Sequence, residues 1–180
     1  KKIDEKGVNY PFEATQEYLA NGDYLVGNLE CVISTHGESS RRWEFQADPK
    51  VMEGLNNAGF NLLNLANNHI LDYGEQALND TLDALETKSI NYVGLHEGNS
   101  IEESIGKMQR PFLVEINGIE FAFLSYLHNY VDVWYETESY YQPMVLSHQT
   151  LENEISYVNT HYPEAFVIIQ IHWRINPQYN

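Results

Sequence analysis

Two asparagines and a histidine directly follow an apolar segment in the stretch "NLANNHILDYG", residues 64–74. Asparagine offers a carbonyl oxygen to cations, and the imidazole of His69 binds divalent metals or transfers protons near neutral pH. Asp72 follows three residues later and could either orient the His69 ring or cap the helix predicted to start near Gly74. This spacing indicates metal-binding or acid–base chemistry where a predicted strand ends.

Two other predicted strands also end in polar side chains: 23–30 ends in Asn28 and Glu30, and 165–173 ends in His172 and Trp173. In open α/β sheets the carboxyl ends of parallel strands share one edge, where ligands bind. We therefore expect Glu30, the Asn68–His69 pair and His172 to converge on a single rim.

The candidate ligands at this rim are Glu30, Asn68 and His172, a set suited to a divalent cation such as Mn, Zn or Fe. His69, oriented by Asp72, is the candidate acid or base. Each residue also has a purely structural interpretation. Asn68 would cap the next turn, His172 would be a hydrogen-bonded core histidine, and Asp72 would cap a helix.

Substrate contacts are predicted from further polar and aromatic residues at the same edge, namely Asn28, Asn67 and Trp173. Arg41 and Arg42 are the only adjacent arginines, and they would seat an anionic phosphate or carboxylate or form a solvated pair in a loop. The aromatic-rich segment 128–143 would either line a ligand cleft or pack its rings on the domain.

The elements that must position these residues alternate between strands and helices. A helix is predicted with Asp48 as its cap, Pro49 in its first turn and Gly59 at its end, and two more helices are predicted over 74–89 and 147–162. Strands are predicted over 23–30, 61–66 and 91–94, and a buried strand over 165–173. Asn117-Gly118 between two β-rich segments predicts a hairpin. The pattern indicates one α/β domain, residues 1–180, with parallel pairing and one antiparallel hairpin.

Composition narrows the class of protein. A formal net charge of −16 opposes nucleic-acid binding, which depends on lysine and arginine contacts to phosphate. The single cysteine, Cys31, excludes an internal disulfide and a cysteine-rich zinc site. No apolar segment approaches the roughly 20 residues that span a bilayer, so any export signal or anchor is expected outside this sequence.

Three segments in order resemble a known family: "VGNLECVIS", "AGFNLLNLANNHILDYGEQALNDTLDAL" and "IHW". They are similar to the Asn-Leu-Glu, Ala-Asn-Asn-His with Asp-Tyr-Gly, and His-Trp-Gly motifs of the bacterial capsule synthesis family, typified by the poly-γ-glutamate capsule protein CapA. That family is itself similar to calcineurin-like metallophosphoesterases. The resemblance implies a two-sheet sandwich flanked by helices.

The resemblance also implies roles for residues and for the protein. Glu30 would be a metal carboxylate, Asn68 and His172 would bind metal, and His69 would assist phosphoryl transfer. The sequence departs from the family pattern, because no predicted strand ending in Gly-Asp precedes Asn28, Arg174 replaces a glycine and no Gly-His-x-x-His motif follows. We therefore expect an incomplete family domain that is extracytoplasmic and acts in synthesis, anchoring or export of an anionic surface polymer, with that polymer or its membrane synthesis complex as partner. The open alternatives are a non-catalytic polymer-binding or assembly factor and a phosphoesterase acting on small phosphates.

Overall fold

The computed structural model of the protein describes residues 2–38, 44–98, 111–128 and 139–173. Its helices are α1 (Lys2–Lys6), α2 (Gln16–Leu19), α3 (Val51–Ala58), α4 (Gly74–Thr87) and α5 (His148–His161). The strands of its two larger sheets are β1 (Leu25–Asn28), β4 (Phe60–Asn64), β5 (Asn91–Val93), β7 (Phe112–Ile116), β8 (Ile119–His128), β10 (Val145–Leu146) and β11 (Phe166–His172). Two short pairs complete the described part, β2 (Val32–Ile33) with β3 (Gln46–Ala47), and β6 (Leu95–Glu97) with β9 (Tyr141–Pro143).

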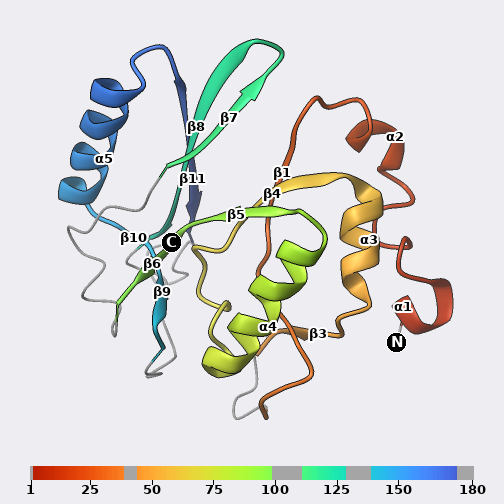
Figure 1. The fold of residues 1–180 in the computed structure, drawn as a ribbon. Helices are drawn as coiled ribbons and strands as arrows, with labels where there is room; N and C mark the ends of the chain where they lie inside the picture. The colour runs from red at the N-terminus through yellow and green to blue at the C-terminus, as the bar shows by residue number, and fades with distance from the viewer. Residues whose placement is uncertain (1, 39–43, 99–110, 129–138, 174–180) are drawn as a thin grey trace, which may run out of the picture.

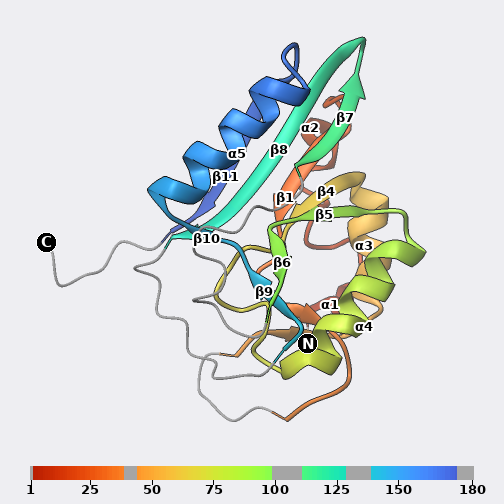
Figure 2. The ribbon, with the colours of Figure 1, turned by 60° about the vertical axis from the view of Figure 1, so that its left-hand side comes forward.

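Two sheets face each other, and helices cover their outer faces (Figure 1). The first sheet has the order β1-β4-β5 and is parallel throughout. In the second, β8 pairs in parallel with β10 and β11 and antiparallel with β7. Helices α3 and α4 lie against the first sheet, and α5 runs along the second (Figures 1 and 2). The predicted helix-flanked α/β sandwich is therefore confirmed.

Apolar side chains fill the space between these layers. The cluster between the two sheets centres on Leu62, Val93 and Phe123, and the cluster under α3 and α4 includes Leu63, Leu65, Leu78 and Leu85. The third cluster, around Leu124, Tyr126 and Met144, packs against Leu151 of α5. Apolar burial on both faces of the first sheet matches the continuous apolar character of its central strand β4.

Local sequence signals account for several element ends. Gly59 ends α3 with φ 85°, and Asn117 and Gly118 turn the β7–β8 hairpin with φ 53° and 81°. Asn-Gly is favoured there because both central residues of such a turn need positive φ. The predicted capping of α3 by Asp48 is wrong, because Lys50 is the N-cap and the Asp48 carboxylate accepts from its backbone N–H at 2.9 Å.

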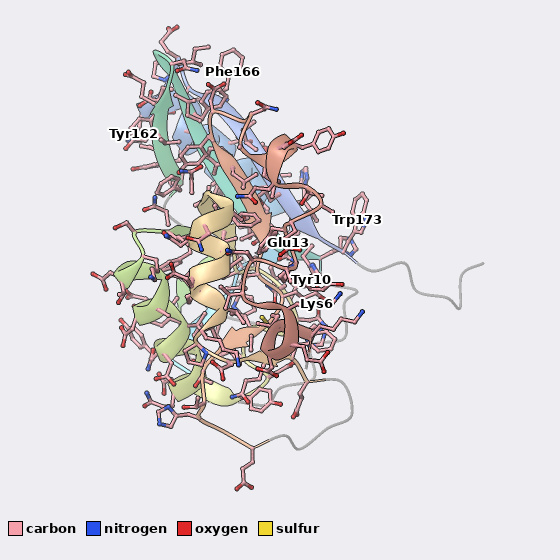
Figure 3. All side chains as sticks on the ribbon, turned by 90° about the vertical axis from the view of Figure 1, so that its right-hand side faces the viewer. Lys6, Tyr10, Glu13, Tyr162, Phe166 and Trp173 are labelled. Atoms are coloured by element: carbon pink, nitrogen blue, oxygen red, sulfur yellow. The ribbon has the colours of Figure 1, made fainter. Side chains whose placement is uncertain are left out.

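The expectation that segment 165–173 is a buried strand is also wrong. In the described part of the chain β11 lies at the edge of its sheet. Four apolar residues of the strand and the tryptophan that directly follows it are exposed by 37–67%: Phe166, Ile168, Ile169, Ile171 and Trp173. Phe166 and Trp173 project from the two ends of this strand (Figure 3). An apolar composition cannot by itself distinguish a central strand from an edge strand.

Candidate functional site

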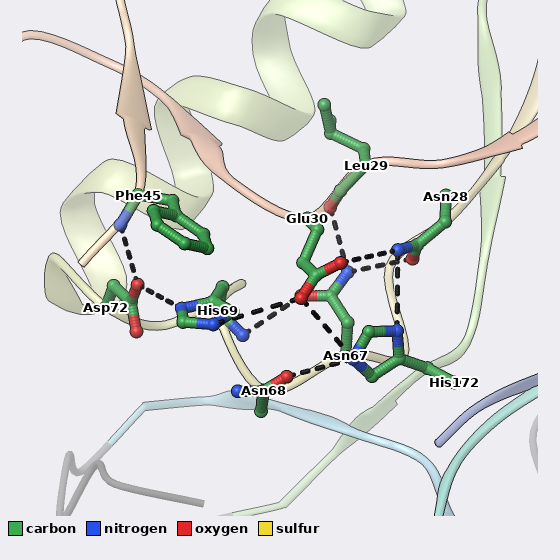
Figure 4. A network of polar contacts seen from close by, with 9 residues as sticks. All are labelled: Asn28, Leu29, Glu30, Phe45, Asn67, Asn68, His69, Asp72 and His172. Carbon is green, nitrogen blue, oxygen red and sulfur yellow. Dashed lines mark hydrogen bonds and ion pairs between the residues drawn. The ribbon is translucent and has the colours of Figure 1, made fainter. Parts of the chain in front are cut away.

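The ends of three strands meet at one rim between the two sheets (Figure 4). Parallel pairing of β1 with β4 sets Asn28 beside Asn64, so the residues that follow each strand emerge together. His172, at the end of β11, reaches the same place from the second sheet. The convergence expected from the strand ends is present, with residues 104 apart in sequence in direct contact.

The Glu30 carboxylate lies at the centre of this group. Its Oε1 is 3.5 Å from His172 Nε2 and 3.8 Å from His69 Nε2. Asn68 Oδ1 lies 2.9 Å from the same His172 nitrogen. The Glu30 side chain is 39% exposed, against 11% for His69 and 15% for His172, so the group opens to solvent at Glu30.

Neighbouring asparagines hold the backbone of this rim. Asn67 donates to the Leu29 carbonyl at 2.8 Å and accepts from the His69 backbone N–H at 3.1 Å. Asn28 donates to Glu30 Oε2 at 3.3 Å and faces His172 Nδ1 at 3.5 Å. The turn is therefore capped by Asn67 and not by Asn68, whose side-chain oxygen is directed to His172.

His69 and Asp72 form a hydrogen-bonded pair. His69 Nδ1 lies 2.7 Å from Asp72 Oδ2, and the Phe45 backbone N–H donates to the same oxygen at 2.8 Å. Tyr73 is the N-cap of α4, without a side-chain bond, so Asp72 orients the imidazole and does not cap the helix. Because a carboxylate only accepts, Nδ1 carries a proton, and Nε2 is the nitrogen that faces Glu30.

Burial dominates the electrostatics of this rim. It raises the pKa of Asp72, and the hydrogen bonds from His69 and Phe45 only partly oppose this. Burial also lowers the pKa of His172, with the Glu30 carboxylate acting in the opposite direction. A neutral His172 ring is therefore favoured near pH 7. Burial, reinforced by the carboxylates of Glu30 and Asp72, raises the pKa of Cys31 to about 11.

The donor set is chemically suited to one divalent cation. Ligands about 2.1 Å from an ion at 90–110° lie roughly 3.0–3.4 Å apart, close to the spacings of His172 Nε2 from Asn68 and Glu30. With Nδ1 facing the Asn28 amide, however, Nε2 of His172 is the protonated nitrogen, so it must change tautomer to act as a ligand. Within the described ranges, no group of three or more His, Cys, Asp or Glu side chains is arranged to hold a metal ion.

The other predicted contacts divide into three groups. Asn28 and Asn67 belong to the rim, whereas Trp173 is 67% exposed and outside this network. Arg41 and Arg42 lie outside the described residues, as does most of the aromatic segment 128–143. Sequence reasoning missed Phe45, which contacts both members of the His69–Asp72 pair, and no motif in the sequence signals it.

The fold and the rim together define a helix-flanked α/β sandwich with a glutamate, asparagine and histidine site at its strand ends. The sequence model of the family described as "Bacterial capsule synthesis protein PGA_cap" matches residues 1–180, and the chain belongs to this family. It is similar to the capsule biosynthesis protein CapA of Bacillus anthracis, with 28% identity over 134 residues, 72% of this chain and 31% of that protein. It is also similar to the PGA biosynthesis protein CapA of Bacillus subtilis (strain 168), with 26% identity over 129 residues, 70% of this chain and 33% of that protein. The chain thus spans about a third of the length of these relatives.

Proposed function

We propose that this protein acts in the biosynthesis of an anionic capsule polymer of the poly-γ-glutamate type, in its synthesis, anchoring or export. Family membership supports the role, and the names of two relatives point to the same process. The observation that carries a chemical role is the convergence of Glu30, Asn68 and His172 within 3.5 Å contacts at one rim.

In this proposal Glu30, Asn68 and His172 hold a divalent cation, Mn, Zn or Fe. Carboxylate, amide oxygen and imidazole nitrogen are all ligands of such ions. A bound cation would supply Lewis-acid polarisation of a phosphoryl or carbonyl oxygen. It would also offset the charge of a chain with formal net charge −16, which otherwise repels an anionic polymer.

His69 is the proposed acid–base residue. Its Nδ1–H is held by Asp72, and its Nε2 faces the open side of the rim next to Glu30. A neutral imidazole fixed in this tautomer accepts a proton at Nε2 and returns it in a later step. The reaction class is metal-dependent hydrolysis of the phosphoesterase type.

A non-catalytic role in binding or assembling the polymer is the second candidate. It is favoured by the contact of the Asn28 amide with His172 Nδ1, which leaves the proton on Nε2 and makes this nitrogen a hydrogen-bond donor to Asn68. In this case the rim would hold the polymer through hydrogen bonds, and His172 would donate from Nε2 as it does to Asn68.

The proposed location is extracytoplasmic, at the cell surface, with the polymer or its membrane synthesis complex as partner. None of the helices in the described residues has both the length and the apolar character that crossing a bilayer requires. Fractionation of cells producing the tagged protein, with detection in the envelope or the cytosol, tests this location.

Calorimetric titration with Mn²⁺ or Zn²⁺ tests the cation. We expect the wild-type protein to bind one ion and His172→Ala to bind at least about tenfold more weakly. His148→Ala is the matched control, because that side chain is 95% exposed on α5 and should leave binding unchanged. In a screen of phosphodiester and poly-γ-glutamate substrates, His69→Ala should abolish turnover while retaining cation binding and folding. No bound ion and no cleavage in the wild-type protein would refute the catalytic proposal.

Asn28→Asp separates the two candidates. A carboxylate at this position accepts a proton from His172 Nδ1 and so favours the tautomer whose Nε2 binds a cation. The cation proposal predicts that this variant binds the divalent cation about tenfold more tightly than the wild-type protein. The polymer-binding proposal predicts that the variant binds the anionic polymer more weakly than the wild-type protein, because the new negative charge lies beside Glu30 at the rim.

A further inference from the structure

Phe45 packs on the His69 ring although much of its own side chain is exposed. The two ring centroids are 4.2 Å apart with a tilt of 34°, and Phe45 is 41% exposed (Figure 4). An exposed aromatic ring forgoes part of the free energy gained by burial. The Phe45 ring nevertheless packs against the imidazole of His69, whose own side chain is only 11% exposed.

The backbone of Phe45 acts on the same pair. Its N–H donates to Asp72 Oδ2 at 2.8 Å, the oxygen that also lies 2.7 Å from His69 Nδ1. Its carbonyl accepts from the Val32 backbone N–H at 3.1 Å. A single residue therefore holds the carboxylate through its main chain and the imidazole through its side chain.

The short β2–β3 pair fixes Phe45 in this place. Val32 and Ile33 pair in parallel with Gln46 and Ala47, the residues that directly follow Phe45. The Gln46 side chain adds a hydrogen bond to the His36 carbonyl at 2.7 Å. Val32 and Ile33 are fully buried in the core, so this strand pair is anchored and sets the position of Phe45 next to it.

We propose that Phe45 is a positioning residue for His69. Its ring fixes the plane of the imidazole and keeps water from the bond between Nδ1 and Asp72, so that Nε2 stays directed at Glu30. Hydrogen bonds shielded from water are stronger and better oriented than solvated ones. This inference deepens the proposed function, because it concerns the group assigned there to proton transfer, but the contact it rests on exists whether or not the protein is an enzyme.

Solvent exchange of the His69 Nδ1 proton, followed by NMR on ¹⁵N-labelled full-length chain, tests the inference. Phe45→Ala should speed this exchange by about tenfold or more, since water then reaches the bond. Phe45→Tyr keeps the ring and should retain the wild-type rate. Phe166→Ala is the control, because it removes another exposed aromatic ring, which contacts Phe121 in a tilted arrangement, and should change nothing at His69.

Phe45→Leu guards against a failure of the alanine variant to fold, because it keeps apolar volume without the flat ring face. It should also exchange faster than wild type. Wild-type exchange in the folded alanine or leucine variant would overturn the inference.

A second readout uses turnover. Phe45→Ala should lower kcat by about tenfold at unchanged KM, and Phe45→Tyr should restore it, because the change affects orientation and not substrate binding. If the wild-type protein shows no turnover at all, the proposed catalytic function fails while the exchange measurement still decides the role of Phe45.

Discussion

Thr81 offers a sharp test of how the helix side of the sandwich supports the rim. Its hydroxyl oxygen accepts from the Ile33 backbone N–H at 2.8 Å and donates to the Ala77 carbonyl at 2.7 Å, with the residue fully buried. This bond ties β2 to α4. Through the pairing of β2 with β3 it also holds the segment that carries Phe45.

Thr81→Val replaces the hydroxyl with a methyl group of similar size. The Ala77 carbonyl keeps its helical partner, but the Ile33 N–H becomes a buried donor without an acceptor. Such a group costs about 1–3 kcal/mol. We expect the variant to lose about 2 kcal/mol of unfolding free energy, with little contribution from a cavity because the volumes match.

Urea unfolding followed by circular dichroism measures this loss. With an m-value of about 2 kcal/mol per M, the midpoint should fall by about 1 M. Thr87→Val is the control, since Thr87 makes the same bond to the carbonyl four residues earlier, at 2.8 Å to Asp83, but on the exposed side of α4. It should stay within about 0.5 kcal/mol of wild type. Equal midpoints for the two variants would refute the role assigned to the Thr81 bond.

Two further predictions concern pH. The hydrogen bond from Ser34, and to a smaller extent the one from His36, lowers the pKa of Asp80 in the folded protein. The Asp80 carboxylate therefore stabilises the fold fully above its pKa in the unfolded chain, and this stabilisation is lost as the pH falls through its pKa in the folded protein. Asp80→Asn should therefore cost about 1 kcal/mol at pH 7 and progressively less below pH 4, measured by urea unfolding, and a cost that stays constant with pH would contradict this. Cys31, with its pKa raised from 9.0 to about 11, should react with iodoacetamide about 100-fold more slowly at pH 8 in EDTA than a free thiol of pKa 9.0, and the rate should rise with pH up to about 11.

Signals that depend on one or two residues were readable from the sequence. The Asn117-Gly118 turn and the Gly59 helix end follow from the positive φ that those positions require. The meeting of Glu30, Asn68 and His172 was also predictable, because parallel strands present their carboxyl ends at one edge. The particular contacts were not, since two neighbouring asparagines offer the same chemistry and only the fold assigns Asn67 to the backbone and Asn68 to His172.

Features that depend on distant pairing could not be read from the sequence. Phe45 reaches Asp72 across 27 residues through a strand pair of only two residues, too short to produce an alternating pattern. The exposure of β11 depends on which strands lie next to it and not on its own composition. The residue types that form the rim were thus predictable from the sequence, whereas the residues that hold them in place, such as Phe45, required the three-dimensional structure.

The contact between Asn68 and His172 has a consequence for how the protein is made. Its partners are 104 residues apart, so at about 5–20 residues per second a ribosome needs roughly 5–20 s after Asn68 to supply His172. During that interval the nascent chain can already pair His69 with Asp72, but the rim lacks its second histidine. The complete site therefore arises only after β11 has been synthesised and has docked beside β8.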